Sequence, residues 1–346
     1  MGEGDENFQR VADMFLKQYK NLLVERFREG GDNHRFQRLI QNNSFARDLY
    51  DKANRFSTIY ENASWQSSVL ETLDLDLIYA NVDAMPRESE EQYPDNLVKE
   101  LLRYFKQDFF KWCNKPDCDS CGPGTSEQQE PMGTVGPNND EARYECSVVE
   151  LYRHNVCGTV TRFPRYNNPI KLLETRLGRC GEWCNVFTLI LRSFGLEARY
   201  VWNREDHVWC EYYSKYLKRW VHVDSCEQSF DQPYIYSVNW NKKMSYCIAF
   251  NKDTMIDVSK RYILKNQLPR DQISEDDLKF LCNFVTRKLR SQLSDKDIYD
   301  LACQDSLEEL GYFPTKTDAK KAIKTQAQGR ESGSADWKGE RGEDGS

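Results

Sequence analysis

The chain has 346 residues, which is enough for one large domain with an insert or for two domains. Its net charge of -7 is spread along the sequence without a basic stripe, so nucleic acid is not expected as the main partner. The N-terminus is charged, and no apolar run is long enough to span a bilayer. We therefore expect a soluble cytoplasmic protein, with the nucleus as a second location. Its twelve cysteines are then expected to be metal ligands, catalytic groups and buried thiols rather than disulfides.

The first third of the chain is predicted to be helical. Residues 7–29 have an amphipathic pattern that ends at Gly30-Gly31, and this helix could pack on the body or on a partner. Residues 36–49 predict a second helix. With Asp95 as N-cap, apolar positions at helical spacing predict one long amphipathic helix that continues to Trp112.

A cysteine-rich segment follows. Its middle, residues 122–139, is rich in Gly, Pro, Ser and Gln and is predicted to be a flexible loop. The two flanks carry the spaced pairs Cys118-x2-Cys121 and His154-x2-Cys157, which predict a tetrahedral Cys3His site for one structural zinc ion. Cys113 and Cys146 are spare candidates for this site, and a set of reduced buried thiols is the alternative.

Cys180 is the candidate nucleophile. It stands between a glycine turn and the first turn of a helix that is apolar nearly all round and ends at Gly195. At such a position unpaired N–H groups and the helix dipole favour the thiolate, so a lowered pKa is expected for this cysteine. A buried structural cysteine is the alternative, since cysteine is among the most buried residue types.

Three strand-like runs follow this helix: 198–202, 207–213 and 219–224. If the last two form a hairpin in which Tyr213 faces Lys218, then His207 lies opposite Asp224. Side-chain alternation then gives that face a set of polar and aromatic residues, namely His207, Trp209, Glu211, Trp220, His222 and Asp224.

A carboxylate that holds one imidazole nitrogen and leaves the other free is what general acid/base catalysis requires. If the central helix places its N-terminus over this face, Cys180, His207 and Asp224 form a nucleophile, an acid/base and an orienting group. A hydrogen-bonded core histidine and a strand-end aspartate remain the alternatives.

The C-terminal part contains two helix starts with capping-box spacing, Ser274 to Asp277 and Ser294 to Asp297. Beyond about Thr315 the composition predicts disorder. Trp337 is then either a tail residue without a specific role or a short docking anchor. The chain is thus divided into five regions. They are an N-terminal helical region (1–60), a helical part of the core (61–112), a zinc-binding segment (113–160), a catalytic core with C-terminal helices (161–310) and a disordered tail (311–346).

Three blocks carry a family resemblance: Gly178-Arg-Cys-Gly-Glu-Trp-Cys184, Val201-Trp-Asn-Arg-Glu-Asp-His-Val-Trp-Cys-Glu211 and Trp220-Val-His-Val-Asp-Ser-Cys-Glu227. The chain resembles the cytosolic peptide:N-glycanases of fungi, which belong to the transglutaminase-like superfamily. The resemblance runs from about residue 65 to 305 and is weaker over the first helix and residues 330–337. It implies an α+β fold: a papain-like core with a central helix packed on an antiparallel sheet, a zinc-binding insert and flanking helices.

The resemblance also implies roles for single residues. It places the nucleophile on Cys180, the general acid/base on His207 and the orienting acid on Asp224. Glu227 matches a substrate-contacting glutamate, and Trp220 lies where the family lines its cleft; Trp209, Trp220 and Trp240 could stack on sugar faces. The implied zinc ligands are Cys118, Cys121 and Cys157, together with His154 at a position where the family has cysteine.

The implied activity is hydrolysis of the amide between an asparagine side chain and the first N-acetylglucosamine of its glycan, which leaves aspartate. The substrates would be misfolded glycoproteins of endoplasmic-reticulum-associated degradation, and the N-terminal helical region would bind a ubiquitin-receptor shuttle protein of the proteasome. Two alternatives stay open: a protein-crosslinking transglutaminase with the same triad, and a zinc scaffold without catalysis.

Overall fold

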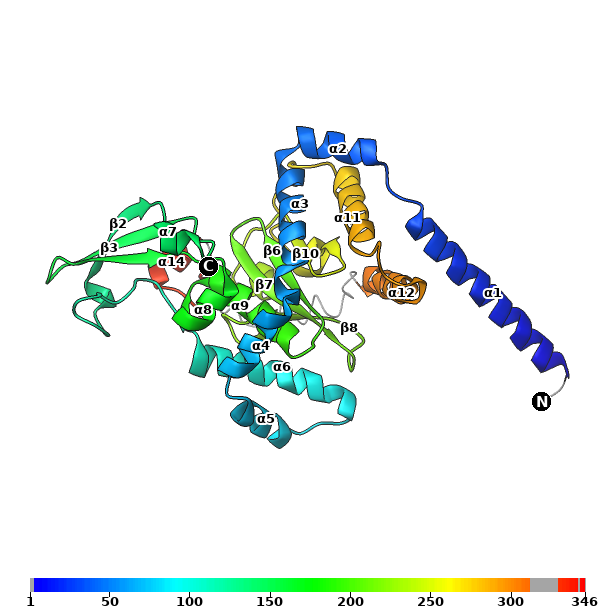
Figure 1. Cartoon of the computed structure of the whole chain (residues 1–346), viewed down its shortest axis with the longest axis horizontal. Coiled ribbons are helices and arrows are strands. Elements are labelled where there is room, and N and C mark those ends of the chain that lie inside the picture. Colours follow the sequence, from blue (N-terminus) through cyan, green and yellow to red (C-terminus); the bar gives the residue numbers. More distant parts are fainter. Residues whose placement is uncertain (1–2, 312–328, 342, 346) are drawn as a thin grey trace.

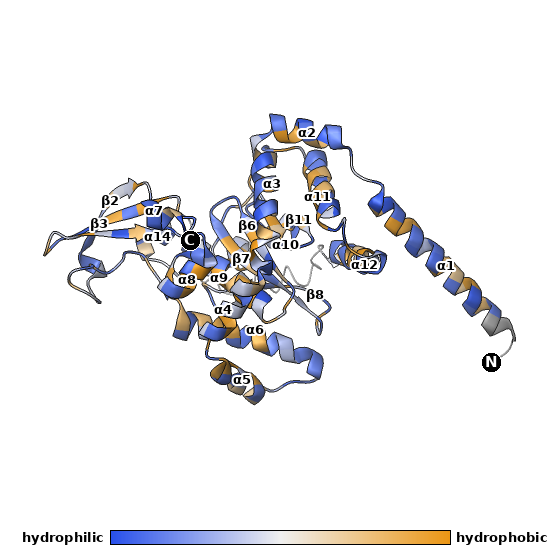
Figure 2. Cartoon of the chain, viewed as in Figure 1, coloured by the Kyte–Doolittle hydropathy of each residue, from blue (hydrophilic) through white to orange (hydrophobic). Residues whose placement is uncertain are grey.

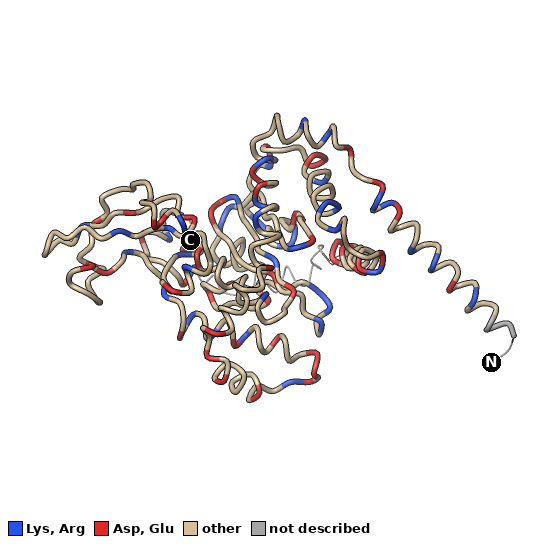
Figure 3. Tube along the Cα trace, viewed as in Figure 1, with Lys and Arg blue, Asp and Glu red and all other residues tan. Residues whose placement is uncertain are grey.

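A computed structural model describes residues 3–311, 329–341 and 343–345 of the chain. The fold is α+β, as predicted, with a six-stranded antiparallel sheet at its centre, a three-stranded sheet on one side and helices on the other (Figure 1). Lysines and arginines are interspersed with acidic residues along the trace (Figure 3). None of the helices in the described ranges combines the length and the apolar character needed to cross a membrane.

The helices, in chain order, are α1 (Glu3–Arg28), α2 (Asn33–Asn42), α3 (Ser44–Phe56), α4 (Ala63–Thr72), α5 (Leu75–Ala84), α6 (Tyr93–Tyr104), α7 (Asn139–Ala142), α8 (Pro169–Thr175), α9 (Cys180–Ser193), α10 (Ser259–Tyr262), α11 (Glu275–Leu289), α12 (Asp295–Gly311) and α14 (Ala335–Glu340). The strands are β1 (Lys111–Trp112), β2 (Gln129–Val135), β3 (Val149–His154), β4 (Val160–Pro164), β5 (Leu177–Gly178), β6 (Ala198–Asn203), β7 (His207–Ser214), β8 (Arg219–Asp224), β9 (Ser229–Phe230), β10 (Cys247–Phe250) and β11 (Met255–Asp257).

The amphipathic helix predicted for residues 7–29 is confirmed as α1, and Gly30 follows it with φ +50°. This helix projects from the body of the molecule (Figure 1), and apolar and polar residues alternate along it (Figure 2). Its large apolar side chains are exposed, for example 76% at Phe8 and 66% at Phe15. The helix therefore carries an apolar surface that the described part of the chain leaves uncovered.

Two helical predictions were wrong in their boundaries. Residues 36–49 do not form one helix, because Asn43 ends α2 in extended conformation and its side chain accepts the Ala46 N–H at the start of α3. Asp95 is not an N-cap. It lies inside α6 and is buried, where its carboxylate accepts hydrogen bonds from Tyr212 and Ser214 of β7.

The predicted long helix up to Trp112 also ends early. After α6 the chain makes a five-residue π turn at Phe105–Phe109 and then enters the short strand β1. The rings of Phe105 and Phe110 pack edge-on against Trp183 of α9, with centroids 5.3 and 5.4 Å away. Packing on the central helix, rather than helical periodicity, therefore accounts for these apolar positions.

Helix α9 is the central element of the fold, as predicted. Eleven of its residues are buried, and Gly195, with φ +71°, follows its end. It packs on the central sheet, whose strand order is β11-β10-β6-β7-β8-β9. On the outer part of this sheet α3 and α11 form a second apolar cluster with β10, through residues such as Leu49, Ile248 and Leu281.

The hairpin of β7 and β8 forms, but its predicted register was wrong by two residues. Tyr213 pairs with Trp220 rather than with Lys218, and Ser214 pairs with Arg219. The turn is one residue later because Ser214 accepts the Leu217 N–H and Lys218 adopts φ +54°. A shift of two residues keeps every side chain on its predicted face.

The cysteine-rich segment is more ordered than predicted. Residues 129–135, which fall in the predicted flexible loop, form β2, and β2 pairs with β3 in a three-stranded antiparallel sheet that β4 completes. The loop prediction was wrong here because the low apolar content reflects an exposed edge strand.

The prediction of a disordered tail was wrong for residues 329–341 and 343–345. Helix α14 is capped by Ser334, and the side chains of Arg330 and Glu343 are fully buried. Composition gave no sign of this, because the segment is held by buried ion pairs and by contacts of Arg330 with tryptophan rings rather than by an apolar face. Residues 312–328, also part of that prediction, lie outside the described residues.

Candidate active site and metal centre

His207 and Asp224 form a buried hydrogen-bonded pair on one face of the central sheet. His207 Nε2 lies 2.9 Å from Asp224 Oδ2, and both side chains are at most 1% exposed. The corrected register places the two residues diagonally across β7 and β8 rather than directly opposite, which is within reach of an imidazole. The structure thus brings together two of the three predicted catalytic residues.

Burial and hydrogen bonds set the charges of this pair. Burial and the nearby cation Arg330 lower the pKa of His207, against the opposing effect of Asp224. Burial alone would raise the pKa of Asp224, but the hydrogen bonds from His207 and Tyr236 hold it below its usual value. The pair is therefore a neutral imidazole beside a carboxylate at neutral pH.

The second imidazole nitrogen, His207 Nδ1, is buried and has no hydrogen-bond partner among the described residues. Because the ionised carboxylate can only accept, Nε2 carries the proton and Nδ1 is the free lone pair. An oriented imidazole with one unpaired nitrogen is suited to accept and return a proton.

A second layer of hydrogen bonds fixes Asp224. The Tyr236 hydroxyl donates to Asp224 Oδ2 at 2.8 Å, and the Cys226 N–H donates to Oδ1 at 2.8 Å. His222 Nε2 in turn lies 2.7 Å from the Tyr236 hydroxyl. The sequence placed His222 on this face, but nothing in it indicated Tyr236, which comes from a π turn after β9.

Cys180 is the first residue of α9. The side chain of Glu182 accepts the Arg179 N–H at 3.0 Å, which closes the first turn. Gly178 is required there, since a Cβ atom at this position would lie 2.4 Å from Glu182 Cβ. The thiol thus stands at a helix N-terminus, as predicted.

The expected lowering of the thiol pKa was wrong in direction. Cys180 is 9% exposed, and burial raises its pKa, while the Arg330 cation acts to lower it. Desolvation therefore outweighs the helix terminus. Together with a neutral His207, this makes the resting pair a thiol and a free imidazole rather than an ion pair.

The sequence left open which face of the hairpin the central helix covers, and the condition for a triad concerned only the N-terminus of the helix. The body of α9 does not pack on the face that carries His207. It packs on the opposite face of the hairpin, where Cys184 Sγ lies 3.7 Å from Cys210 Sγ. The His207 face is covered instead by Tyr236 and Trp240, whose ring centroids are both 5.0 Å from the imidazole. Alternation fixed which residues share a face but not which element covers it.

The predicted substrate residues have different surroundings. The carboxylate of Glu227 accepts the N–H groups of Glu331 and Ser332 at 2.8 and 3.2 Å and the Ser332 hydroxyl at 2.6 Å. Burial and the charge of Asp224 raise the pKa of Glu227. Glu227 thus joins the catalytic loop to the C-terminal segment.

Trp220 is buried at the far end of β8 from Asp224, with the Arg199 guanidinium 3.7 Å from its ring centroid. Trp220 and Asp224 are four steps apart along the strand, about 13 Å. Trp209 and Trp240 are also buried, at 1% and 0%. The structure does not bring these three rings to an open cleft in this conformation.

Other rings line an open pocket next to the site. This pocket, of about 670 Å³, is lined by Trp112 and Trp183, by Cys226 and by residues 331–333 of the C-terminal segment. A pocket with an apolar wall and a few polar groups is suited to bind a ligand that carries sugars. Sequence reasoning did not single out Trp112 or Trp183 because both follow helix-like apolar spacing.

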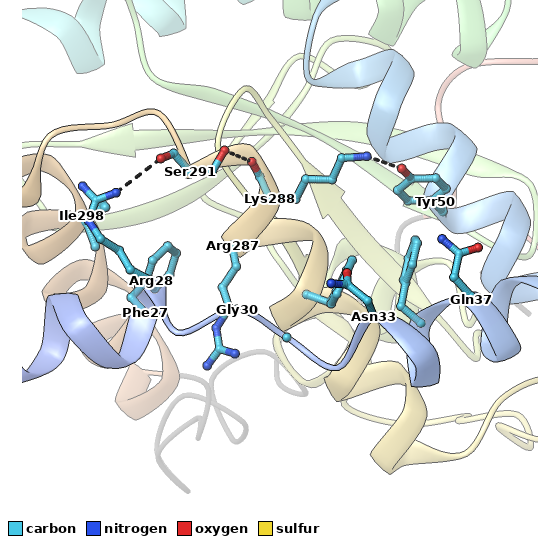
Figure 4. Close-up of a pocket in the computed structure, with 13 residues that line it drawn as sticks. Phe27, Arg28, Gly30, Asn33, Gln37, Tyr50, Arg287, Lys288, Ser291 and Ile298 are labelled. Carbon is cyan, nitrogen blue, oxygen red and sulfur yellow. Dashed lines mark hydrogen bonds between the residues drawn. The ribbon is translucent and has the colours of Figure 1, made fainter.

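A second hollow, of about 500 Å³, lies at the base of α1 and contains none of the predicted site residues (Figure 4). There the Lys288 ammonium points to the hydroxyl of Tyr50, and Arg28 reaches the carbonyl of Ser291 at 3.4 Å. These contacts join the N-terminal helices to α11 and the turn that follows it. The Arg28 contact holds the end of α1, and the Lys288–Tyr50 contact joins α11 to α3.

The predicted metal ligands converge. Ligand atoms of Cys118, Cys121, His154 and Cys157 all lie within 4.8 Å of one another. Cys118 Sγ lies 3.5 Å from Cys157 Sγ, and His154 Nδ1 lies 3.6 Å from Cys121 Sγ and 3.1 Å from Cys157 Sγ. The spare candidates Cys113 and Cys146 are not part of this cluster.

These distances and donors fit a tetrahedral ion. Arms of about 2.3 Å would place the ligand atoms roughly 3.8 Å apart, close to the spacing observed. Three thiolate donors and one imidazole are a set that zinc prefers. The cluster could therefore hold a metal ion, and its composition is consistent with zinc.

The chain matches two sequence profiles of known families. Residues 133–225 match the transglutaminase-like superfamily core, and residues 201–303 match the Rad4 transglutaminase-like domain. Together the matched ranges contain Cys180, His207 and Asp224. The transglutaminase-like fold expected from the sequence is thus confirmed.

Full-length relatives are similar over nearly the whole chain. The peptide-N(4)-(N-acetyl-beta-glucosaminyl)asparagine amidase of Saccharomyces cerevisiae is 61% identical, over 98% of this chain and 97% of that protein. The protein of the same name from Candida glabrata is 60% identical, over 99% of both chains. A solved structure titled "Crystal structure of Rad4-Rad23 crosslinked to an undamaged DNA" is 14% identical with a TM-score of 0.46, over 80% of this chain and 60% of that chain, which supports no statement about function.

Proposed function

Because the chain belongs to the family of peptide-N(4)-(N-acetyl-beta-glucosaminyl)asparagine amidases, which are hydrolases of a carbon–nitrogen bond, we propose that it removes N-glycans from misfolded glycoproteins through Cys180, His207 and Asp224. The observation that carries the proposal is the buried His207–Asp224 pair with an unpaired Nδ1. Cys180 heads the central helix of the same core.

In the first step the Cys180 sulfur attacks the side-chain carbonyl carbon of the glycosylated asparagine. His207 Nδ1 accepts the thiol proton and returns it to the departing glycosylamine nitrogen, so the C–N bond breaks and a thioester remains. Asp224 stabilises the imidazolium through its hydrogen bond to Nε2.

In the second step water hydrolyses the thioester. His207 Nδ1 takes a proton from this water, and the oxygen adds to the carbonyl carbon. The thiolate then leaves and regains the proton from the imidazolium, which releases aspartate in place of asparagine. The first N–H groups of α9 are donors available to the tetrahedral oxyanion.

The pocket beside the site suits the glycan. Trp112 offers a partly exposed ring, against which the buried ring of Trp183 packs with centroids 6.2 Å apart. Glu227 stands at the C-terminal border of the pocket through its bonds to Glu331 and Ser332. We assign the chitobiose end of the glycan to this pocket, because sugars stack on rings and hydrogen-bond to carboxylates.

Zinc, held by Cys118, Cys121, His154 and Cys157, would supply structural cross-linking of the segment and no chemistry at the scissile bond. The three-stranded sheet touches the catalytic helix through Glu150, whose carboxylate accepts from Arg179 at 2.9 and 2.7 Å and from Arg165 at 2.9 Å. The metal segment therefore supports the N-terminus of α9.

The proposal extends to a role in protein degradation in the cytoplasm, with the nucleus as a second location. The exposed apolar residues of α1 are the surface we assign to a ubiquitin-receptor shuttle protein of the proteasome. A helix of 26 residues with one apolar side can lie in the groove of such a partner.

The test is incubation of the full chain with a denatured high-mannose glycoprotein, followed by mass analysis of the glycan and of the glycosylated peptide. Release of the intact glycan with conversion of asparagine to aspartate is expected. The Cys180→Ala variant is the control, and it should bind the glycopeptide without converting it.

The same assay separates the alternatives. Incorporation of a primary amine that outpaces glycan release would indicate a crosslinking transglutaminase. Equal glycan release by the wild type and Cys180→Ala would refute the thiol mechanism, and no release by the wild type would favour a zinc scaffold.

A further inference from the structure

The C-terminal segment places an arginine inside the proposed active site. Arg330 has a fully buried side chain, although it lies on a segment without regular structure. Its Nε is 3.8 Å from Glu227 Oε1 and donates to the Ser332 hydroxyl at 2.9 Å. Nothing in the two-step mechanism above uses this residue.

The guanidinium is held rigidly. Nη1 donates to Glu343 Oε2 at 2.6 Å, and the Arg330 N–H donates to the Glu343 carbonyl at 2.9 Å. The guanidinium carbon also lies 5.2, 5.0 and 4.6 Å from the ring centroids of Trp112, Trp240 and Trp337. Such stacking and a fixed ion pair leave the cation little freedom.

The carboxylates around Arg330 are shared with other groups. Glu343 also pairs with Lys242 at 2.5 Å and with Arg341 at 3.3 Å, and Arg341 pairs with Asp206 as well. Glu227 is the second carboxylate near Arg330, and its oxygens accept hydrogen bonds from Glu331 and Ser332. These ion pairs therefore hold Arg330 in place without using all of its donors.

One donor of Arg330 is left over. Nη2 is buried and has no hydrogen-bond partner among the described residues. A fully buried, unpaired guanidinium N–H is unfavourable. The cost is relieved when a ligand, or an anionic group that forms during the reaction, accepts its hydrogen bond. The guanidinium also lies beside the catalytic imidazole, because the ring centroid of Trp240 is 5.0 Å from the Arg330 guanidinium carbon and 5.0 Å from the centroid of the His207 ring. From there the Arg330 charge acts to lower the pKa of the Cys180 thiol.

We propose that Arg330 is a positioning residue of the deglycosylation reaction: Glu343 and the three tryptophans hold its guanidinium as a fixed cation that stabilises the anion formed at Cys180. The inference rests on the proposed function, because it concerns the same thiol. It assigns the segment 329–345 to the catalytic machinery rather than to a tail.

The test uses the full-length zinc-loaded chain and two substitutions, Arg330→Met and Arg330→Lys. The first readout is the rate at which iodoacetamide alkylates Cys180 as a function of pH, followed by mass analysis of the peptide that contains Cys180. In this reaction the sulfur bonds to carbon, iodide leaves and the thiol proton passes to solvent. The second readout is kcat/KM on a glycopeptide over the same pH range.

Loss of the cation should move the alkylation midpoint of Arg330→Met up by roughly one pH unit, with about tenfold slower alkylation below the midpoint. The acid limb of kcat/KM should move in the same direction, since Arg330 also lowers the pKa of His207. Arg330→Lys keeps the charge and should give an intermediate shift. A purely structural role would not move these midpoints.

Lys338→Met is the matched control. Lys338 belongs to the same segment, and its ammonium donates only to the Arg330 carbonyl at 3.0 Å among the described residues. Its removal takes one positive charge from α14 and should leave the alkylation midpoint in place. Thermal unfolding and zinc content verify that each variant is folded.

Alkylation and kcat/KM curves of Arg330→Met that coincide with those of the wild type would overturn the inference. Failure of both Arg330 variants to fold would also overturn it, because Arg330 would then have a structural role alone. If the wild type does not release glycans but the alkylation midpoint still moves, the proposed function fails while the charge effect on Cys180 stands.

Discussion

The His207–Asp224 pair and the Cys3His cluster hold their functional groups in different ways. His207 and Asp224 lie on neighbouring strands, are at most 1% exposed and gain further hydrogen bonds from the surrounding fold. In the metal cluster two ligands, Cys121 and Cys157, are exposed. The side-chain contacts that join its four ligands to one another are thiol–thiol and thiol–imidazole contacts.

The difference indicates what each site depends on. Strand pairing and burial fix the catalytic pair, so its geometry belongs to the folded sheet. The cluster joins a short loop that carries Cys118 and Cys121 to the end of β3 and the turn after it, which bury little apolar surface, so its geometry depends on a bound ion. Glu150 connects the two regions through Arg179 and Arg165, and a change in the metal segment should therefore reach Cys180.

The largest effect is expected at the thiol. Cys180→Ala should lower kcat/KM by about 10⁴-fold or more, because no other group can form the thioester. Loss of one buried sulfur should cost about 1 kcal/mol of stability or less. Glycan release and urea unfolding measure the two effects, and retained turnover would contradict the role of Cys180.

Asp224→Asn should have the next largest effect, a loss of roughly 10²- to 10⁴-fold in kcat/KM. An asparagine amide can hold the imidazole in the wrong tautomer and cannot stabilise the imidazolium. Steady-state kinetics on a glycopeptide measure it. If Asp224→Asn were as active as the wild type, the orienting role would be wrong.

Metal removal should separate the two regions. Chelation, or the substitution Cys118→Ala, should abolish hydrogen-exchange protection in β2, β3 and β4 and leave the amides of β7 and β8 protected. Activity should fall about tenfold or more through the lost support of α9. Equal loss of protection in both sheets would contradict the comparison, and Cys146→Ala is the control that should retain the metal.

Tyr236→Phe should have a smaller effect on kcat/KM than Asp224→Asn. It removes the hydroxyl between His222 and Asp224 but leaves the His207–Asp224 bond intact. A lost hydrogen bond to a charged group is worth about 1.5 to 3 kcal/mol, so a decrease of roughly ten- to a hundredfold in kcat/KM is expected. A loss as large as that of Cys180→Ala would show that Tyr236 acts in the reaction itself.

The smallest effect is expected in the pH dependence of kcat/KM, whose acid limb should be displaced. Since burial and Arg330 lower the pKa of His207, the free base persists below pH 6.5, and the acid limb of kcat/KM should lie below that value. In Asp224→Asn the residual activity should show a still lower limb, because the anion that raises the imidazole pKa is gone. An acid limb above pH 6.5 in the wild type would contradict the neutral resting imidazole.

Local patterns accounted for much of the fold and for part of the site. Side-chain alternation placed His207 and Asp224 on one face, and a register error of two residues did not matter because the strand period is two. The cluster of Cys118, Cys121, His154 and Cys157 was predictable because each pair of ligands is only three residues apart in the sequence. The position of Cys180 followed from a glycine turn before an apolar run.

Contacts between distant segments were not predictable from such patterns. The face of the hairpin on which α9 packs depends on the whole arrangement of helices, and Val208 and Cys210 do not differ enough from Trp209 in polarity to decide it. Arg330 and Glu343 lie in a polar sequence, and their burial depends on the ion pairs that Glu343 forms with Arg330 and Lys242. Such reciprocal burial leaves no periodic signal.

The central claim is that the chain hydrolyses the asparagine amide itself. The most direct test is the mass of the glycosylated site after incubation of a denatured glycopeptide with the wild type in water enriched in oxygen-18. The account predicts aspartate with one solvent oxygen and a glycan that keeps both of its core N-acetylglucosamines. An asparagine that still carries one N-acetylglucosamine, or an aspartate without solvent oxygen, would contradict it.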